Sequence, residues 1–209
     1  MRSLLRGLYG ITPQRLLDDD RRLTDAVTAA LEGGMRLLQY RAKMRSPTDR
    51  LRQAGLLKRL CADHDALFIV NDDLDLALAS GADGVHLGEQ DGSVAEARTR
   101  LGDGAIIGAS CYNRIDLAEV AAASGASYLA FGRFFPSLSK PQAVQAEPSL
   151  LQSARERFDL PLCAIGGITP ANAGVLVAAG ADLIAVIEGL FGRPDIGAAA
   201  GHFSRALRA

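Results

Sequence analysis

A short glycine-containing sequence recurs four times along the chain, as Ala30-Leu-Glu-Gly-Gly34, Ala79-Ser-Gly-Ala-Asp83, Ala123-Ser-Gly-Ala-Ser127 and Ala178-Ala-Gly-Ala-Asp182. Each copy ends a helix-type segment and directly precedes an apolar run of β type. The copies are spaced by about 45 to 55 residues, the length of two strand–helix units. A fourfold repeat of two such units predicts a closed (β/α)8 barrel, the TIM-barrel architecture.

Strand-type and helix-type segments alternate along the chain, and eight of each are predicted. The predicted strands are 8–12, 36–41, 67–71, 84–88, 105–110, 128–134, 162–166 and 183–187. The predicted helices are 21–33, 48–64, 74–80, 94–101, 115–124, 149–158, 171–179 and 195–207. The rival is a doubly wound open sheet, which usually has five or six strands and, when it binds a dinucleotide, a GxGxxG turn after the first strand. Ile11-Thr-Pro-Gln14 stands there instead, so we expect one barrel domain over residues 1–209, without large insertions.

Composition and charge exclude several classes of protein. Of the 209 residues, 48% are hydrophobic and 22% are charged, as in an ordinary globular domain. A net charge of −1 provides no field that attracts nucleic acid or an anionic membrane surface. No apolar run approaches the roughly 20 residues that span a bilayer, and Arg6 interrupts the segment where a secretory signal would continue. We therefore expect a cytoplasmic protein without nucleic-acid or membrane partners.

The three cysteines are far apart in the sequence, at Cys61, Cys111 and Cys163. They form no CxxC motif and no Cys/His cluster of the kind that binds zinc. We expect reduced and mostly buried thiols.

Polar residues gather where the predicted strands end, and active sites of (β/α)8 barrels are built at that edge. Along the end of the second strand, Gln39, Arg41 and Lys43 alternate and so lie on one side of it. Later strand ends add amide, carboxylate and hydroxyl groups, at Asn71, Asp72, Asp73, Asp91 and Ser110. The loop after the sixth strand carries Ser137, Ser139 and Lys140, and the seventh strand ends in Gly166-Gly167.

These residue types suit a diphosphate substrate and a divalent metal ion. Two carboxylates that follow different strands suit Mg²⁺, which usually completes its shell with substrate phosphates. A glycine loop at a helix start after the seventh strand is a common phosphate site in barrels. The sequence contains no Ser/His/Asp arrangement, GxSxG, P-loop or HExxH motif. The set indicates a reaction in which pyrophosphate leaves and fixed cations stabilise its developing charge.

Each feature also has a purely structural interpretation. Arg41 and Lys43 could be solvated strand ends, and Asp72 and Asp73 could cap the following helix. The carboxylate after the fourth strand could belong to a turn. His86 is better explained as a strand histidine than as a catalytic base. A functional site is favoured because these groups end successive strands of one barrel.

Six segments together resemble the thiamine-phosphate synthase family, and the similarity runs from residue 8 to residue 187. They are Gln39-Tyr-Arg-Ala-Lys43, Asn71-Asp-Asp73, Gly84-Val-His-Leu-Gly-Glu-Gln-Asp91, Gly108-Ala-Ser110, Phe131-Gly-Arg-Phe-Phe-Pro-Ser-Leu-Ser-Lys140 and Ala164-Ile-Gly-Gly-Ile-Thr169. The resemblance implies that 4-amino-2-methyl-5-(diphosphooxymethyl)pyrimidine is joined to 4-methyl-5-(2-phosphooxyethyl)thiazole, which gives thiamine phosphate and pyrophosphate. It also implies a dissociative, magnesium-assisted mechanism, in which the thiazole nitrogen captures a pyrimidinylmethyl cation.

The resemblance implies a role for each matching residue. Positions that hold the pyrimidine diphosphate are Gln39, Arg41, Lys43, Asn71, Ser110 and Lys140, of which Lys43, Ser110 and Lys140 are expected to act in catalysis. Asp72 and Asp91 match the Mg²⁺ ligands. Positions that hold the thiazole phosphate are Ser137, Ser139, Gly167, Ile187 and Glu188. The family usually has serine in place of Glu188, whose carboxylate would repel a phosphate unless it turns away.

Two other functions are alternatives: a thiazole tautomerase of the same fold, and a non-catalytic paralogue that binds thiamine precursors. The tautomerase needs neither a magnesium pair nor a pyrophosphate-binding lysine, so Lys43, Asp72, Asp91 and Lys140 together favour the synthase. Glu188 is the feature that supports the paralogue. The expected partners are the two small-molecule substrates, and a homo-oligomer is compatible with this interpretation.

Overall fold

Eight parallel strands close into a barrel in the computed structural model, which describes residues 5–136 and 144–207. They are β1 (Gly7–Ile11), β2 (Met35–Tyr40), β3 (Leu67–Asn71), β4 (Gly84–Leu87), β5 (Ile106–Tyr112), β6 (Tyr128–Gly132), β7 (Leu162–Ile165) and β8 (Leu183–Val186). Each strand pairs with the next along the chain, and β8 pairs with β1 to close the sheet. The predicted (β/α)8 barrel is confirmed, and the open-sheet alternative is wrong.

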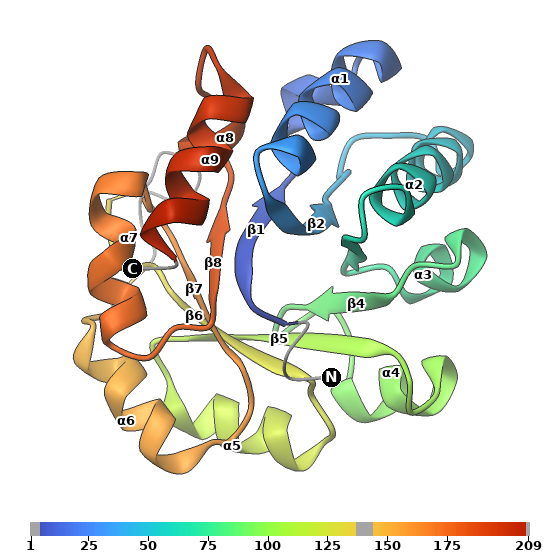
Figure 1. Cartoon of the computed structure of the whole chain (residues 1–209). Helices are drawn as coiled ribbons and strands as arrows, with labels where there is room; N and C mark the ends of the chain where they lie inside the picture. The colour runs from blue at the N-terminus through green and yellow to red at the C-terminus, as the bar shows by residue number, and fades with distance from the viewer. Residues whose placement is uncertain (1–4, 137–143, 208–209) are drawn as a thin grey trace.

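Helices surround the barrel (Figure 1). They are α1 (Asp20–Glu32), α2 (Pro47–Ala62), α3 (Leu74–Ser80), α4 (Val94–Leu101), α5 (Ile115–Ala123), α6 (Ser149–Arg157), α7 (Pro170–Ala178), α8 (Glu188–Phe191) and α9 (Ile196–Ala206), with a short 3₁₀ helix, η1 (Gln14–Leu16). The two short helices, η1 and α8, were not predicted, because three or four residues are too few to show a helical period. Among the described residues, no helix has the length and apolar character needed to cross a membrane.

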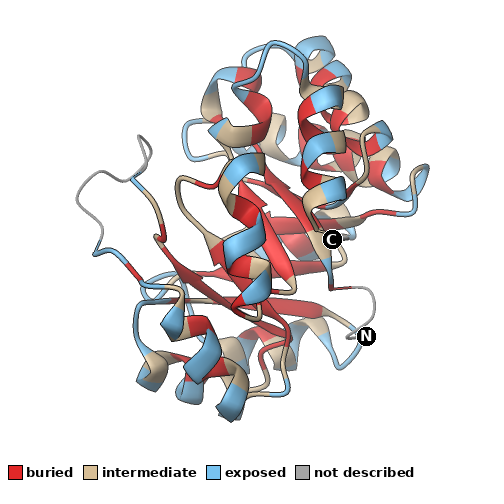
Figure 2. Ribbon diagram, turned by 60° about the vertical axis from the view of Figure 1, so that its left-hand side comes forward, coloured by how far each residue is buried: buried red, intermediate tan, exposed pale blue. Residues whose placement is uncertain are grey.

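Buried residues form two layers, one inside the barrel and one between the strands and the helices. Inside the barrel, side chains such as Tyr9, Ile69 and Tyr128 pack against one another. Figure 2 shows the burial concentrated on the strands and on the helix faces turned toward them. All three cysteines are buried and free, as expected, and burial raises the pKa of the Cys61 and Cys111 thiols to about 12.

The recurring sequence forms hydrogen bonds at the amino end of the barrel, where the strands begin. Asp83 Oδ2 accepts a hydrogen bond from Phe68 N (2.8 Å), and Asp83 N donates to Phe68 O (2.9 Å). The last copy repeats this arrangement, because Asp182 Oδ2 accepts from Leu162 N (2.9 Å) and Asp182 N donates to Leu162 O (2.8 Å). In both copies the residue before an even-numbered strand therefore holds the start of the preceding strand. Gly34, which ends the first copy, has no side chain to take part.

The third copy uses a hydroxyl in the same way. We call the bonds made by Asp83, Ser127 and Asp182 clasps, and each clasp also binds a basic residue from a helix. Ser127 Oγ accepts from Ile107 N (3.0 Å), and Ser127 N donates to Ile107 O (2.6 Å). Lys58 of α2, Arg98 of α4 and Arg155 of α6 donate to the side chains that end the second, third and fourth copies. In these three copies the last residue therefore joins three elements: the start of the preceding strand, the strand that follows the copy, and a helix.

We expect Asp182→Ala to lower the free energy of unfolding by about 2 to 3 kcal/mol, because it leaves the Leu162 N–H and the Arg155 guanidinium without their shared acceptor. The clasp lies at the barrel end opposite the strand ends that were predicted to carry chemistry, so the activity of the folded variant should be retained. Urea unfolding measures the change. The matched control is Asp103→Ala, an exposed residue whose side chain makes no hydrogen bond or ion pair with a described residue. Equal stability of the two variants would contradict the role of the clasp.

Candidate active site

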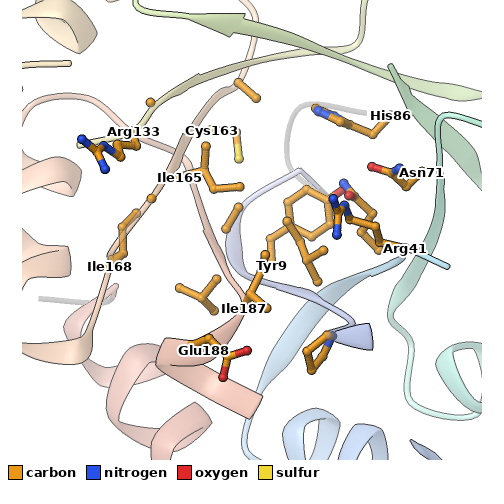
Figure 3. Close-up of a pocket in the computed structure, with 18 of the residues that line it drawn as sticks. Tyr9, Arg41, Asn71, His86, Arg133, Cys163, Ile165, Ile168, Ile187 and Glu188 are labelled. Atoms are coloured by element: carbon orange, nitrogen blue, oxygen red, sulfur yellow. The ribbon is translucent and has the colours of Figure 1, made fainter. Parts of the chain in front are cut away.

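A pocket of about 520 Å³ opens at the carboxyl ends of the strands. Every strand contributes a residue to its wall: Tyr9, Gln39, Asn71, His86, Ser110, Ala130, Cys163 and Ala185 are the examples from β1 to β8. In Figure 3, Arg41, Asn71 and His86 gather on one side of the pocket, while Arg133, Ile168 and Glu188 lie on the other. The pocket is therefore where the sequence predicted the chemistry of a (β/α)8 barrel to lie.

The structure brings the predicted site residues together. Those that it describes all line this pocket: Gln39, Arg41, Lys43, Asn71, Asp72, Asp91, Ser110, Gly167, Ile187 and Glu188. Three others, Ser137, Ser139 and Lys140, lie outside the described residues. The structure therefore gives the position of these residues at the pocket, and the roles assigned to them stay predictions.

The neighbouring aspartates after β3 have different surroundings. Asp73 caps α3, because its Oδ1 accepts a hydrogen bond from Leu76 N (2.8 Å). Asp72 instead lines the pocket, and its backbone has a φ of +63°, in the left-handed region that aspartate tolerates better than most residues. The capping interpretation therefore holds for Asp73 alone, and the turn of the chain leaves the Asp72 carboxylate at the pocket wall.

Two carboxylates and one ammonium group meet at this wall. Burial, followed by the nearby Asp91 carboxylate, raises the pKa of Asp72, while Lys43 acts in the opposite direction. Lys43 Nζ lies 3.5 Å from Asp72 Oδ2. A Cβ at Gly88 would lie 2.4 Å from Asp91 Oδ2, so a larger residue there would require the carboxylate to move. The pair carries one more negative charge than Lys43 neutralises, which favours an additional cation.

Arg41 is positioned through its backbone. Thr12, which follows β1 and is 1% exposed, accepts a hydrogen bond from Arg41 N at its Oγ1 (2.9 Å). The Arg41 carbonyl accepts from the same hydroxyl at 3.5 Å. The chain beyond β2 is thereby tied to β1 at the pocket rim. Sequence reasoning placed Thr12 in a strand and missed this function.

The opposite wall is a tightly packed glycine loop. Gly166 and Gly167 both have positive φ, of +105° and +63°. A Cβ at Gly167 would lie 2.3 Å from Pro136 O, and Phe135 N donates to Gly166 O (3.0 Å), so the loop after β7 packs directly against the segment after β6. Helix α7 begins three residues later and presents its positive end to this side of the pocket. Together these backbone groups suit an anion.

Glu188 begins α8 at the same wall, and it is paired. Arg15 of η1 donates from Nη1 to Glu188 Oε1 (2.6 Å) and from Nη2 to Phe191 O (2.7 Å). One guanidinium therefore compensates the Glu188 charge and holds the last residue of α8. The repulsion that the sequence predicted between this carboxylate and a phosphate is offset by a residue that sequence reasoning did not single out.

Comparison with known proteins assigns this chain to a family. The family model described as thiamine monophosphate synthase matches residues 8–190. The chain belongs to the thiamine monophosphate synthase family. Thiamine-phosphate synthase of Chromobacterium violaceum is 57% identical over 196 residues, which cover 94% of this chain and 93% of that protein. The same enzyme of Thioalkalivibrio sulfidiphilus is 53% identical, over 91% of this chain and 90% of that protein.

A solved structure agrees with the sequence relatives of the family. Thiamine phosphate pyrophosphorylase from Pyrococcus furiosus superposes with a TM-score of 0.89 at 35% identity, and the match covers 99% of this chain and 97% of that one. The chain is therefore an enzyme, a transferase of thiamine biosynthesis, as the sequence indicated.

The residues present fit the magnesium ion that the family resemblance implies. Asp72 and Asp91 lie close enough for the second carboxylate to raise the pKa of the first. Within residues 5–136 and 144–207, no group of three or more His, Cys, Asp or Glu residues could hold a metal ion. One or two carboxylates are the donor set expected of a Mg²⁺ ion that shares its shell with substrate phosphates.

Further residues of the pocket were not found by sequence reasoning. Tyr9 and Cys163 form part of its floor, and Arg133 and Arg193 line it. His86 lies in β4, as expected of a strand histidine, but its ring also faces the pocket. Side chains along a strand point alternately into the barrel and toward the helices. Counting this alternation would have placed Tyr9 and His86 inside the barrel. No local signal marks the two arginines, because their place depends on how the loops fold.

Proposed function

We propose that this enzyme joins 4-amino-2-methyl-5-(diphosphooxymethyl)pyrimidine to 4-methyl-5-(2-phosphooxyethyl)thiazole and releases thiamine phosphate and pyrophosphate. The observation that carries the proposal is the division of the pocket. One wall combines Arg41, Lys43 and two carboxylates, and the opposite wall is a glycine loop beside a helix start. The first suits a diphosphate with a metal ion, and the second suits a monophosphate.

The pyrimidine diphosphate is assigned to the wall formed by β2 to β5. Gln39 and Ser110 lie within their strands, β2 and β5, and would meet the pyrimidine ring. Arg41 and Asn71 lie nearer the rim and, with Lys43, would hold the diphosphate, to which Lys140 is also assigned. Asp72 and Asp91 would hold Mg²⁺, which supplies positive charge to the leaving pyrophosphate when bound.

The thiazole phosphate is assigned to the wall formed by β7 and β8. The backbone around Gly167, Ile187 and Gly189 would bind the phosphate, and Ser137 and Ser139 are assigned to the same ligand. A Cβ at Gly189 would lie 2.2 Å from Ile168 O, so this backbone approaches the loop after β7 closely. The two ligands would thus face each other across the floor that Tyr9 forms.

The reaction needs no catalytic base, because the thiazole nitrogen that attacks carries no proton. The bond from the pyrimidine methylene carbon to the diphosphate oxygen breaks, and its electron pair leaves with pyrophosphate. The nitrogen lone pair then forms the new carbon–nitrogen bond. The residues of the pocket therefore have to orient the two rings, exclude water and stabilise charge on the leaving group.

The decisive experiment combines the purified chain with both substrates and Mg²⁺ and measures pyrophosphate and thiamine phosphate. We expect equal amounts of the two products, loss of both with EDTA, and recovery when Mg²⁺ is restored. Absence of both products at every Mg²⁺ concentration would contradict the proposal. In that case, isomerisation of a thiazole substrate without pyrophosphate would support the tautomerase, and ligand binding without turnover would support the paralogue.

We expect Arg15→Ala to raise the KM for thiazole phosphate about three- to tenfold, because Glu188 then carries an uncompensated charge beside the phosphate. Glu188→Ser should lower that KM. In the double variant, Glu188→Ser should cancel the rise in KM that Arg15→Ala causes. Steady-state kinetics of the unsubstituted enzyme and the three variants measure the coupling, with the KM for the pyrimidine substrate as the internal control. An unchanged KM in Arg15→Ala would show that the carboxylate does not act on the phosphate.

A further inference from the structure

A chain of buried hydrogen bonds crosses the barrel floor beneath the pocket. Gln39 Nε2 donates to Tyr9 Oη (2.8 Å), whose hydroxyl is 2.8 Å from Tyr128 Oη. Tyr128 Oη is in turn 2.9 Å from His86 Nδ1, and His86 Nε2 is 2.9 Å from Ser110 Oγ. The chain therefore connects β2, β1, β6, β4 and β5. Its two ends, Gln39 and Ser110, both line the pocket.

The chain has a single consistent direction. Tyr9 accepts from the Gln39 amide, so its own hydrogen goes to Tyr128. Tyr128 then has its hydrogen left for His86 Nδ1, which makes Nδ1 an acceptor. The His86 ring must carry its proton on Nε2 and donate it to Ser110. A proton on Nδ1 would reverse Tyr128 and leave the buried Tyr9 hydrogen without an acceptor among the described residues.

Burial holds the chain in this form. Tyr9 and Tyr128 are 1% and 0% exposed, and burial raises the pKa of both hydroxyls well above the ordinary value, so each remains a neutral donor. The His86 and Tyr128 rings are stacked with their centroids 5.6 Å apart, and Tyr9 meets Tyr128 edge to face. Because both hydroxyls are buried and bonded to each other, the direction is set by the hydrogen bonds of the chain itself.

The direction determines what each end offers to a ligand. Gln39 has committed an amide hydrogen to Tyr9, so its Oε1 is the atom left to accept a hydrogen bond. Ser110 accepts from His86, so its own hydroxyl hydrogen is left to donate. A flat heterocycle on the floor would meet an acceptor from β2 and a donor from β5.

We infer that Tyr9, Tyr128 and His86 are positioning residues that orient the pyrimidine ring by fixing Gln39 as a hydrogen-bond acceptor and Ser110 as a donor. This inference rests on the proposed function. An aminopyrimidine matches the pair, because its exocyclic amino group donates and its ring nitrogens accept. An oxo-pyrimidine in place of the amino compound would present an acceptor to Gln39 Oε1 and would be rejected.

The tautomer of His86 tests the direction without any substrate. In the ¹⁵N-histidine-labelled enzyme, long-range ¹H–¹⁵N correlation spectra distinguish protonation at Nε2 from protonation at Nδ1. The chain has three histidines, and the variants His64→Gln and His202→Gln assign the other two. We expect His86 to be present only as the Nε2–H tautomer. In Tyr128→Phe we expect a mixture of the Nε2–H and Nδ1–H tautomers. An Nδ1–H tautomer, or unchanged His86 signals in Tyr128→Phe, would overturn the inference whether or not the enzyme makes thiamine phosphate.

Tyr128→Phe also tests the effect on the ligand, because Tyr128 does not itself line the pocket. The expected result is a three- to tenfold rise in the KM for the pyrimidine substrate, with an unchanged KM for thiazole phosphate. Tyr40→Phe is the matched control, since it removes one buried hydroxyl whose bond to Gln53 (2.8 Å) lies outside the pocket. A similar rise in both variants, or no rise in Tyr128→Phe, would show that the chain has only a structural role.

Discussion

We expect Asp91→Asn to lower kcat about 100-fold, the loss typical when one preorganised electrostatic group is removed from an active site. The substitution keeps the shape of the side chain and removes one of the two carboxylates assigned to Mg²⁺. It also removes the charge that helps to raise the pKa of Asp72. Lys43, 3.5 Å from Asp72, then neutralises the remaining carboxylate, and the wall loses its excess negative charge.

The measurement is kcat as a function of Mg²⁺ concentration, together with calorimetric titration of Mg²⁺ in the presence of pyrophosphate. We expect weaker Mg²⁺ binding alongside the lower kcat. Glu89→Gln is the matched control, because it removes a carboxylate from the same loop, where Glu89 faces Arg114 at 3.7 Å rather than the pocket. Full activity of Asp91→Asn, or an equal loss in Glu89→Gln, would remove Asp91 from the site.

We expect Gly167→Ala to raise the KM for thiazole phosphate about tenfold or more and to lower the free energy of unfolding by about 1 to 3 kcal/mol. The added methyl group would lie 2.3 Å from Pro136 O and 2.7 Å from Phe135 O, and both are backbone atoms that a rotamer change cannot move. The φ of +63° adds strain for any residue with a Cβ. The loop after β7 must therefore shift, and with it the backbone assigned to the phosphate.

Gly174→Ala provides the control for this substitution. Gly174 lies within α7, and a Cβ there meets nothing within 4 Å, so alanine should stabilise the protein by about 0.5 to 1 kcal/mol and leave both KM values unchanged. Thermal unfolding and steady-state kinetics are measured for the pair. A normal KM for thiazole phosphate in Gly167→Ala would show that the glycine loop does not bind the phosphate.

Most of the fold could be predicted from local sequence. The strands 67–71 and 84–88 were located to within one residue. The first of them begins with a continuous apolar run, Leu67 to Val70, as a buried parallel strand does. The barrel itself followed from the four recurring copies, and the structure explains three of them as clasps formed by Asp83, Ser127 and Asp182. Helix α8 escaped prediction because its four residues are held by contacts distant in sequence, such as the Arg15 bond to Phe191 O.

The site could be predicted in position but only partly in detail. Strand ends in a barrel converge by topology, so the order of the strands is enough to place Gln39, Asn71 and Ser110 together. The division between Asp72 and Asp73 could not be predicted, because either residue can cap a helix and only the left-handed turn at Asp72 separates them.

The sequence by itself determined the closed barrel, the edge at which the site lies and the pair of carboxylates beside a lysine. These follow from periodicity and from the order of residues along the chain, which local rules capture. Only the tertiary structure decided that Arg15 pairs with Glu188 and that Tyr9, Tyr128 and His86 connect Gln39 to Ser110. Such contacts join residues far apart in the chain, so they exist only once the strands have closed in register and excluded water from the barrel floor.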